Sequence, residues 1–156
     1  IFFARGAIET VKKLRWTPNI ILCSGWMSAL APLYLKKAYN NEPFFAHSKI
    51  VLMLDNEEYT KPFGTKFAEK LRIDGISNTD VRSIAGFPVG YEELMRLAVD
   101  YSDAVVYASP QVNQRVMNYA ETKGKPILPF EEYENENEFC KRQWEFFQTL
   151  LDKTDE

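Results

Sequence analysis

The sequence predicts an α/β fold, a Rossmann-like three-layer sandwich around a parallel sheet of about four strands. Short apolar runs of strand length alternate with longer segments of helical spacing along the chain. One of these runs, Lys49 to Asp55, is apolar almost without interruption, which is typical of a strand covered on both faces. Strands joined by helices in this order pair in parallel through right-handed crossovers.

Helices and strands alternate in the first half of the chain. Thr17-Pro18 ends the first helix, because the residue before a proline disfavours helical geometry. Pro32 falls early in the second helix, where a proline costs least. Thr60 and Pro62 open the third helix. The expected elements are helix 7–15, strand 20–23, helix 28–39, strand 49–55 and helix 62–72.

A long connection rich in Gly, Ser, Asn and Asp, residues 74–90, comes before the second half of the chain. A loop of that length usually covers another part of the protein or holds a short helix. Further on, Ser109-Pro110 predicts a helix start with Ser109 as the N-cap, and Gly124 ends that helix. The expected elements are helix 91–101, strand 104–108, helix 110–123, strand 126–130 and helix 137–151. In the last helix the side chains expected to face the body are Phe139, Trp144, Phe147 and Leu151.

Composition limits the classes of function. A chain of 156 residues with 46% hydrophobic residues forms about one domain with a sizeable core. The 22 acidic residues outnumber the 19 basic ones, which argues against nucleic acid and against an anionic membrane surface. No apolar run is long enough to span a membrane. The chain opens on Ile1-Phe2-Phe3, so we expect it to be part of a longer polypeptide.

Two cysteines at unrelated positions and a single histidine, His47, form no metal or disulfide framework. We therefore expect Cys23 and Cys140 to be free thiols in a reducing cytoplasm. No glycine-rich Gly-x-Gly-x-x-Gly or Walker-type phosphate loop follows any strand. No metal or cofactor is expected.

Ligands of open α/β sheets gather at the carboxyl ends of the strands. Ser24-Gly25-Trp26 supplies a hydroxyl, a glycine that admits close approach, and an aromatic plate suited to a sugar ring. Asn56 follows the second strand among the carboxylates Asp55, Glu57 and Glu58, and Ser109-Pro110-Gln111 follows the third. The fourth cluster at this edge is Glu131-Glu132.

Each cluster also has a structural interpretation, and the sequence leaves both open. Trp26 is either a ligand platform or a packed corner residue. The 55–58 carboxylates are either an acid–base pair or a solvated loop. Ser109 is either a ligand or a helix cap. His47 has no obvious partner as a general base, and Cys23 has no histidine beside it in sequence.

The stretch RWTPNIILCSGWMSALAPLYLKKAY resembles the bacterial glycogen synthase and starch synthase family. The residues that match the family pattern there are Trp16, Pro18, Trp26, Leu30, Pro32, Tyr34 and Leu35. KIVLMLDNEEY is similar to a second family segment, with Asn56 and Tyr59 matching. AVDYSDAVVYASPQV is similar to a third, with Tyr101, Asp103, Ser109 and Pro110 matching. The resemblance extends from about Trp16 to about Val116.

The resemblance implies two Rossmann-like domains facing across a cleft and transfer of glucose from ADP-glucose to an α-1,4-glucan with retention. It identifies this chain as a later part of the first, acceptor-side domain, with an α-glucan or nucleotide-sugar as partner of the full-length protein. The substrate-binding candidates are Ser24, Gly25, Trp26, Asn56 and Ser109, and no residue is assigned as catalytic.

This chain departs from the family pattern in ways that bear on activity. The family's histidines fall on Leu22, Ser24, Met27 and Asp55, and there is no Gly-Gly for its donor-phosphate loop. Two hypotheses follow: a fragment of a glucan synthase that is inactive by itself, or a non-catalytic glucan-binding or regulatory module. An unrelated flavodoxin-like interaction domain is a third.

Overall fold

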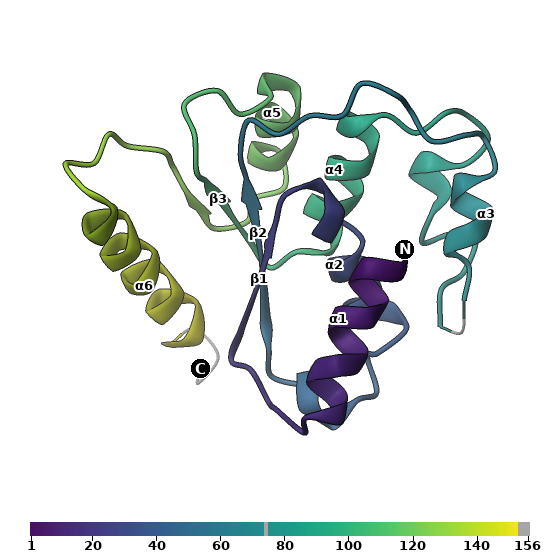
Figure 1. The fold of residues 1–156 in the computed structure, drawn as a ribbon, viewed down its shortest axis with the longest axis horizontal. Coiled ribbons are helices and arrows are strands. Elements are labelled where there is room, and N and C mark those ends of the chain that lie inside the picture. The colour runs from purple at the N-terminus through teal and green to yellow at the C-terminus, as the bar shows by residue number, and fades with distance from the viewer. Residues whose placement is uncertain (74, 153–156) are drawn as a thin grey trace.

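The computed structural model describes residues 1–73 and 75–152 and confirms the predicted fold class. Its four strands form one parallel sheet in the order β1-β2-β3-β4 (Figure 1). The strands are β1 (Ile20–Ser24), β2 (Lys49–Leu54), β3 (Ala104–Tyr107) and β4 (Ile127–Leu128). The α-helices are α1 (Phe2–Lys13), α2 (Ala31–Lys37), α3 (Phe67–Leu71), α4 (Tyr91–Tyr101), α5 (Gln114–Glu121) and α6 (Glu136–Asp152). The 3₁₀ turns are η1 (Trp26–Ser28), η2 (Pro43–Phe45) and η3 (Arg82–Ile84).

The sheet has a helical layer on each face, as predicted. Figure 1 shows α6 alone on one side, while α1, α2, α4 and α5 lie on the other. Side chains of β2 alternate between these layers: Leu52 and Leu54 pack with the larger group, and Val51 packs with α6. All three are completely buried, which confirms that the apolar run in β2 marks a strand covered on both faces.

In the first half of the chain, three helices begin elsewhere than the sequence indicated. Helix α1 starts at Phe2 and continues through Gly6, because Ala4 and Ile8 share its buried face. Helix α2 starts at Ala31, which puts Pro32 in its first turn, where no intrahelical N–H bond is lost. The helix expected over 62–72 shortens to α3, Phe67–Leu71, with Phe63 instead paired to Val89 in an antiparallel bridge.

Strands and helices of the second half follow the prediction more closely. Helix α4 has the predicted bounds, and β4 is shortened to two residues between Pro126 and Pro129, which lack an N–H for the ladder. The connection before α4 holds η3 and buries Val81 and Ile84, while Asp74 lies outside the described residues.

The cap of α5 and the facing of α6 correct two predictions. The N-cap is Asn113, whose Oδ1 accepts from the N–H groups of Arg115 and Val116, so Ser109 is not the cap. In α6, Trp144 was expected to face the body but is 64% exposed, whereas Leu150 is buried. The stripe of α6 that packs against the sheet contains the partly buried Phe139, Phe146 and Phe147 and the buried Leu150, and Trp144 lies off it.

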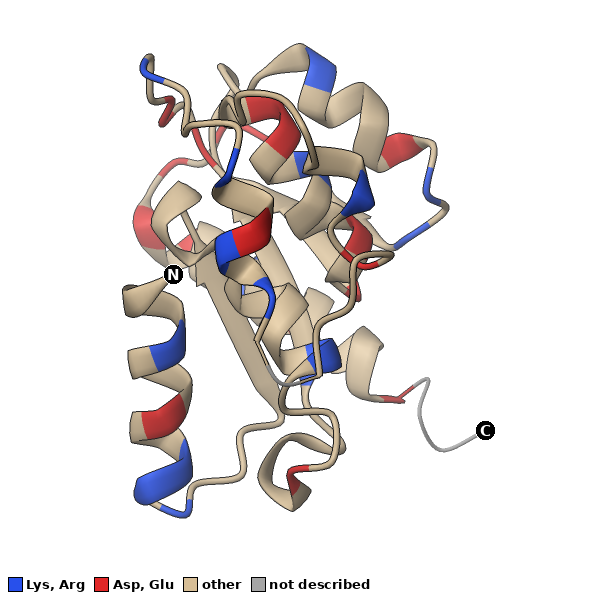
Figure 2. Ribbon diagram, turned by 90° about the vertical axis from the view of Figure 1, so that its right-hand side faces the viewer, with Lys and Arg blue, Asp and Glu red and all other residues tan. Residues whose placement is uncertain are grey.

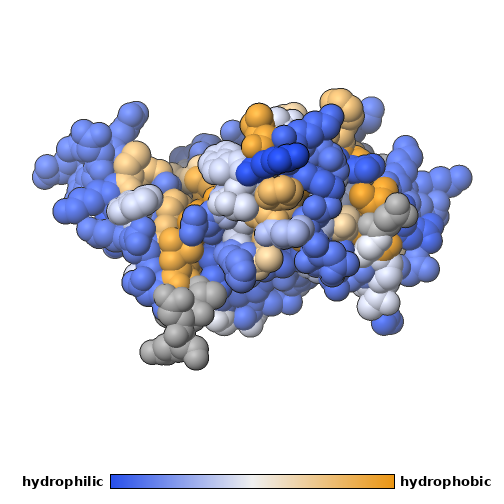
Figure 3. Space-filling view, turned by 90° about the horizontal axis from the view of Figure 1, so that it is seen from below, coloured by the Kyte–Doolittle hydropathy of each residue, from blue (hydrophilic) through white to orange (hydrophobic). Residues whose placement is uncertain are grey.

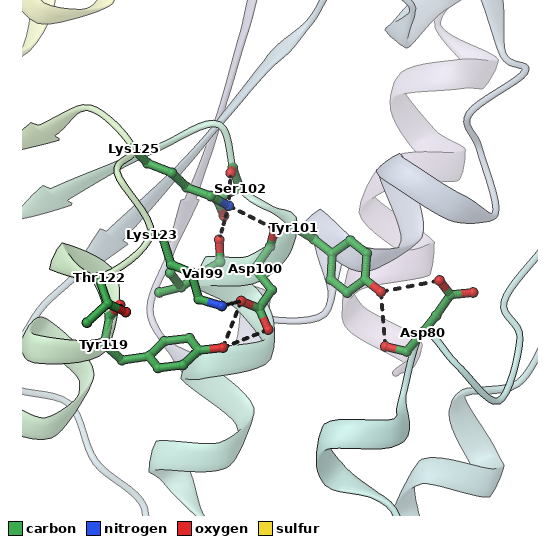
Figure 4. Close-up of polar contacts among 9 residues, drawn as sticks. All are labelled: Asp80, Val99, Asp100, Tyr101, Ser102, Tyr119, Thr122, Lys123 and Lys125. Atoms are coloured by element: carbon green, nitrogen blue, oxygen red, sulfur yellow. Dashed lines mark hydrogen bonds and ion pairs between the residues drawn. The ribbon is translucent and has the colours of Figure 1, made fainter.

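At the amino end of β3 and β4, a polar network joins the segment before β4 to the end of α4 (Figure 4). Lys125 Nζ donates to the carbonyl oxygens of Val99, Asp100 and Ser102 at 2.5, 2.8 and 2.6 Å, which satisfies the last carbonyls of α4. Lys123 Nζ lies 2.8 Å from Asp100 Oδ1. The β3–β4 connection is therefore tied to the end of α4.

The face of the molecule seen in Figure 3 is mainly polar. In Figure 2 positive and negative residues are interspersed over the face shown. Seen from below in Figure 3, hydrophobic residues form separate small patches in a hydrophilic surface. Within the described residues no helix combines the length and apolar character needed to cross a membrane.

Candidate functional site

The carboxyl edge of the sheet brings the predicted site segments together. Ser24 is the last residue of β1, Asn56 follows β2 by two residues, and Ser109 follows β3 by two residues. Because the three strands are parallel and adjacent, these positions share one edge of the sheet. Ser24 and Asn56 are exposed, and Ser109 is partly buried.

Two hydrogen bonds join the loops that follow β2 and β3. Asn56 Nδ2 donates to Gln111 Oε1 at 3.4 Å, and Asn113 Nδ2 donates to Glu58 Oε1 at 3.0 Å. Asn113 therefore caps α5 through its Oδ1 and also binds the loop after β2 through its Nδ2. Gln111 belongs to the predicted Ser109-Pro110-Gln111 cluster, whereas Asn113 was not predicted, because Ser109-Pro110 is a stronger helix-start signal. An asparagine followed by a helical pattern was the available indication.

Gly25 makes the turn between β1 and η1 in a conformation that few residues adopt. Its φ is 71° and its ψ is 167°, a region occupied almost only by glycine. A Cβ at this position would lie 2.7 Å from Glu57 Oε2. Ser28 Oγ donates to the carbonyl oxygens of Ser24 and Gly25 at 2.8 and 2.9 Å, which fixes the turn. The turn at Gly25 and the loop after β2 therefore lie close together.

Trp26 is partly buried in an aromatic cluster, which we call the Trp26 cluster: Trp26, Tyr59 and Phe63. The Trp26 ring lies 5.1 Å from Tyr59 and 6.4 Å from Phe63, centroid to centroid, in tilted arrangements. Tyr59 and Phe63 lie 5.2 Å apart. Trp26 packs against the core yet keeps an accessible part. Its role as a sugar platform stays a prediction.

Burial and nearby carboxylates raise the pKa values of two tyrosines at this edge. Burial, followed by the carboxylates of Glu58, Glu57 and Asp55, raises the pKa of Tyr91 to about 12. Burial and the carboxylate of Glu93 also raise the pKa of Tyr59. Both phenols therefore stay protonated, and the surrounding carboxylates repel an anion such as a diphosphate.

Several other candidates have no catalytic arrangement. Ser109 Oγ accepts from the N–H of Gln111 at 3.1 Å in a local turn. Burial raises the pKa of the Cys23 thiol to about 12, which excludes it as an activated nucleophile. His47 is exposed and precedes β2, away from the carboxyl edge. Within residues 1–73 and 75–152, no group of His, Cys, Asp and Glu is arranged to hold a metal ion.

Comparison with known proteins gives consistent matches. The family model of the starch synthase catalytic domain matches residues 1–126. A glycogen synthase of Clostridium perfringens is 30% identical over 108 residues, which cover 69% of this chain and 22% of that protein. A glycogen synthase of Chlorobium luteolum is 39% identical over 83 residues, covering 53% and 17%. The chain thus spans about a fifth of the length of these relatives.

One solved structure shares the fold. The catalytic domain of Starch Synthase IV from Arabidopsis thaliana, bound to ADP and acarbose, superposes with a TM-score of 0.62. The two sequences are 16% identical, and the match covers 83% of this chain and 28% of the other.

Proposed function

Because this chain belongs to the starch synthase catalytic-domain family, we propose that it is the acceptor-side part of a glycosyltransferase that moves glucose from ADP-glucose to an α-1,4-glucan. It would act in the cytoplasm as one segment of a larger N-terminal catalytic domain. The candidate substrate contacts are Ser24, Gly25, Trp26, Asn56 and Ser109.

The observation that carries the proposal is the shared edge. Ser24 and Asn56, with a hydroxyl and an amide group, are exposed at the same edge of the sheet, and Trp26, which follows β1 by two residues, is only partly buried. A sugar presents a C–H face that packs on an aromatic ring and hydroxyls that pair with such groups. Carboxylates beside them favour a neutral saccharide over a phosphate. The edge is therefore suited to the glucan rather than to the nucleotide.

Binding of a maltooligosaccharide tests this role directly. We expect a Trp26→Ala variant to lose at least about tenfold in affinity, since removing an aromatic platform costs on the order of 1.4 kcal/mol or more. Trp144→Ala is the matched control, because Trp144 is exposed on α6, on the other face of the sheet. Titration calorimetry gives the affinity, and the melting temperature of each variant shows whether the fold survives. An equal loss of maltooligosaccharide affinity in the two variants would contradict the acceptor role, and so would the absence of binding by the unsubstituted chain.

Donor binding gives a second test. The residues here supply neither a glycine-rich phosphate loop nor a basic cluster at the carboxyl edge. We therefore expect ADP-glucose to bind this chain weakly or not at all in calorimetry. A saturable, tight signal with ADP-glucose would contradict the assignment to the acceptor side.

The alternative is a glucan-binding or regulatory module without transferase activity. It is favoured by the absence of the family's histidines, which fall on Leu22, Ser24, Met27 and Asp55. Incorporation of labelled glucose from ADP-glucose into glycogen by the full-length polypeptide separates the two. Incorporation supports the transferase, while glucan binding without incorporation supports the module.

A further inference from the structure

A surface cavity lies between α3 and η3, apart from the carboxyl edge of the sheet. Its volume is about 380 Å³, which is within the range of small-molecule sites, roughly 300–1,000 Å³. Two arginines line it, Arg72 directly after α3 and Arg82 at the start of η3. Figure 1 shows α3 on the side of the sheet opposite to α6, and Figure 2 views this side. The cavity contains none of the candidate glucan contacts.

In the described part of the chain, neither arginine has a carboxylate partner within ion-pair distance. Arg72 Nη1 donates to Asn78 Oδ1 at 2.6 Å, a neutral acceptor that also lines the cavity. Glu69 lines the cavity as well, three residues before Arg72, and is exposed. Two guanidinium groups therefore share the cavity with one carboxylate, which leaves a net positive charge there.

The segment that forms the cavity is basic although the chain is acidic. Residues 61–85 contain five basic and three acidic residues, whereas the whole chain has 19 and 22. One of the three, Asp80, lies outside the cavity lining, with its carboxylate 2.9 Å from Lys37 Nζ. Asp80 also accepts from the N–H of Ser77 at 2.8 Å. The cavity therefore attracts anions, even though the net charge of the chain repels them.

The loop that carries Arg82 is held by contacts with the core. Val81 and Ile84, which flank it, are 2% and 1% exposed. Tyr101 Oη of α4 donates to the carbonyl oxygen of Asp80 at 3.0 Å, just before this pair. The walls are thus fixed before a ligand arrives, which lowers the entropy lost on binding.

We propose that this cavity binds a phosphate oxyanion between Arg72 and Arg82, as inorganic phosphate or as the phosphate monoester of a small polyol. Guanidinium groups donate paired hydrogen bonds to phosphate oxygens, for which their planar geometry is suited. Asn78 and Thr79 offer further donors, and Glu69 can accept from the hydroxyls of a polyol. ADP-glucose has no terminal phosphate group, so its expected weak binding is unaffected.

Titration calorimetry with inorganic phosphate and with glycerol 3-phosphate tests the proposal on the complete encoded polypeptide, at constant ionic strength. Arg72→Gln and Arg82→Gln should each weaken binding at least about tenfold, because each removes charge-assisted hydrogen bonds. Lys70→Gln is the matched control: it removes the same charge from the exposed surface of α3 without lining the cavity. It should change the affinity less than about twofold, since exposed charges are screened by salt.

The two probes distinguish the sources of the phosphate group. Tighter binding of glycerol 3-phosphate assigns the cavity to a monoester and equal binding assigns it to free phosphate, and either result supports the site. Absence of saturable binding of both probes would overturn the proposal. So would binding that both arginine variants leave unchanged, or an equal weakening in Lys70→Gln, which would indicate attraction by charge alone.

Circular dichroism melts establish that each variant folds. If a glutamine variant does not fold, Arg72→Lys or Arg82→Lys takes its place, because lysine keeps the charge but cannot donate paired hydrogen bonds in one plane. We expect these lysine variants to bind phosphate at least about threefold more weakly than the unsubstituted polypeptide. Unchanged affinity in both lysine variants would contradict recognition by the guanidinium groups.

Discussion

Replacing Gly25 by alanine tests the geometry of the β1 corner. A non-glycine residue at φ 71° and ψ 167° costs on the order of 1–3 kcal/mol in backbone strain. The new Cβ would also lie 2.7 Å from Glu57 Oε2. Glu57 is exposed and can rotate away, so the contact adds less than about 0.5 kcal/mol. We expect a loss of about 2 kcal/mol, or roughly 4–8 °C in melting temperature for a domain of this size.

Urea unfolding followed by circular dichroism gives the free energy of unfolding for each variant. Gly6→Ala is the matched control, because Gly6 lies within α1 and its added Cβ meets no atom within 4 Å. That variant should gain about 0.5–1 kcal/mol, since alanine is a better helix former than glycine. The same glycine-to-alanine change should therefore lower the free energy of unfolding at position 25 and raise it at position 6.

The double variant Gly25→Ala with Glu57→Ala separates backbone strain from the side-chain contact. We expect the double variant to remain nearly as destabilised as Gly25→Ala alone. Full recovery in the double variant would refute the argument from backbone strain, and so would a Gly25→Ala variant that loses less than about 0.5 kcal/mol.

Three further predictions concern the rest of the fold. Burial of Asp80 opposes its ionisation, but hydrogen bonds from Lys37 and Ser77 hold its pKa well below the usual range. A carboxyl group with a lowered pKa in the folded state stabilises the fold above about pH 4, and this contribution is lost as the pH falls. The melting temperature of an Asp80→Asn variant should therefore decrease less on acidification than that of the unsubstituted chain. Asn113→Ala should cost about 1 kcal/mol in urea unfolding through loss of the α5 cap, and Asn113→Ser should restore most of it; a loss below about 0.3 kcal/mol would contradict the cap. Cys140 is exposed and should react with an aromatic disulfide reagent within minutes, whereas Cys23 should react only on unfolding.

The sequence predicted the strands well because their burial leaves a simple pattern. Both faces of β2 are covered by helices, so its side chains are buried on either side of the sheet. For this reason Val51, Leu52 and Leu54 are all apolar. The four-stranded parallel sheet and the carboxyl edge follow from that pattern. The family assignment also followed from the sequence, and the match to the starch synthase catalytic domain confirms it.

Helix limits and site contacts were less predictable because they depend on partners distant in sequence. Phe63 is drawn from a helix into a bridge by Val89, 26 residues later, and no local signal marks that pairing. Similarly, Asn113 combines a cap with a hydrogen bond to Glu58 across 55 residues. The prediction that Trp144 faces the body is wrong, because the stripe of α6 that packs against the sheet passes beside it.

The two ends of the sheet offer different prospects for protein engineering. At the amino end, Lys125 ties its ammonium group to three carbonyls of the α4 terminus, and Lys36 joins Asp103 at 2.7 Å (Figure 4 shows the Lys125 contacts). At the carboxyl end Asn56, Glu57, Glu58, Pro110 and Gln111 are exposed, and the loops after β2 and β3 are joined through exposed polar groups. Libraries confined to the exposed positions 56–58, 110 and 111 can therefore change what this edge recognises, while the packed residues Tyr59, Phe63 and Val112 of the same loops are kept.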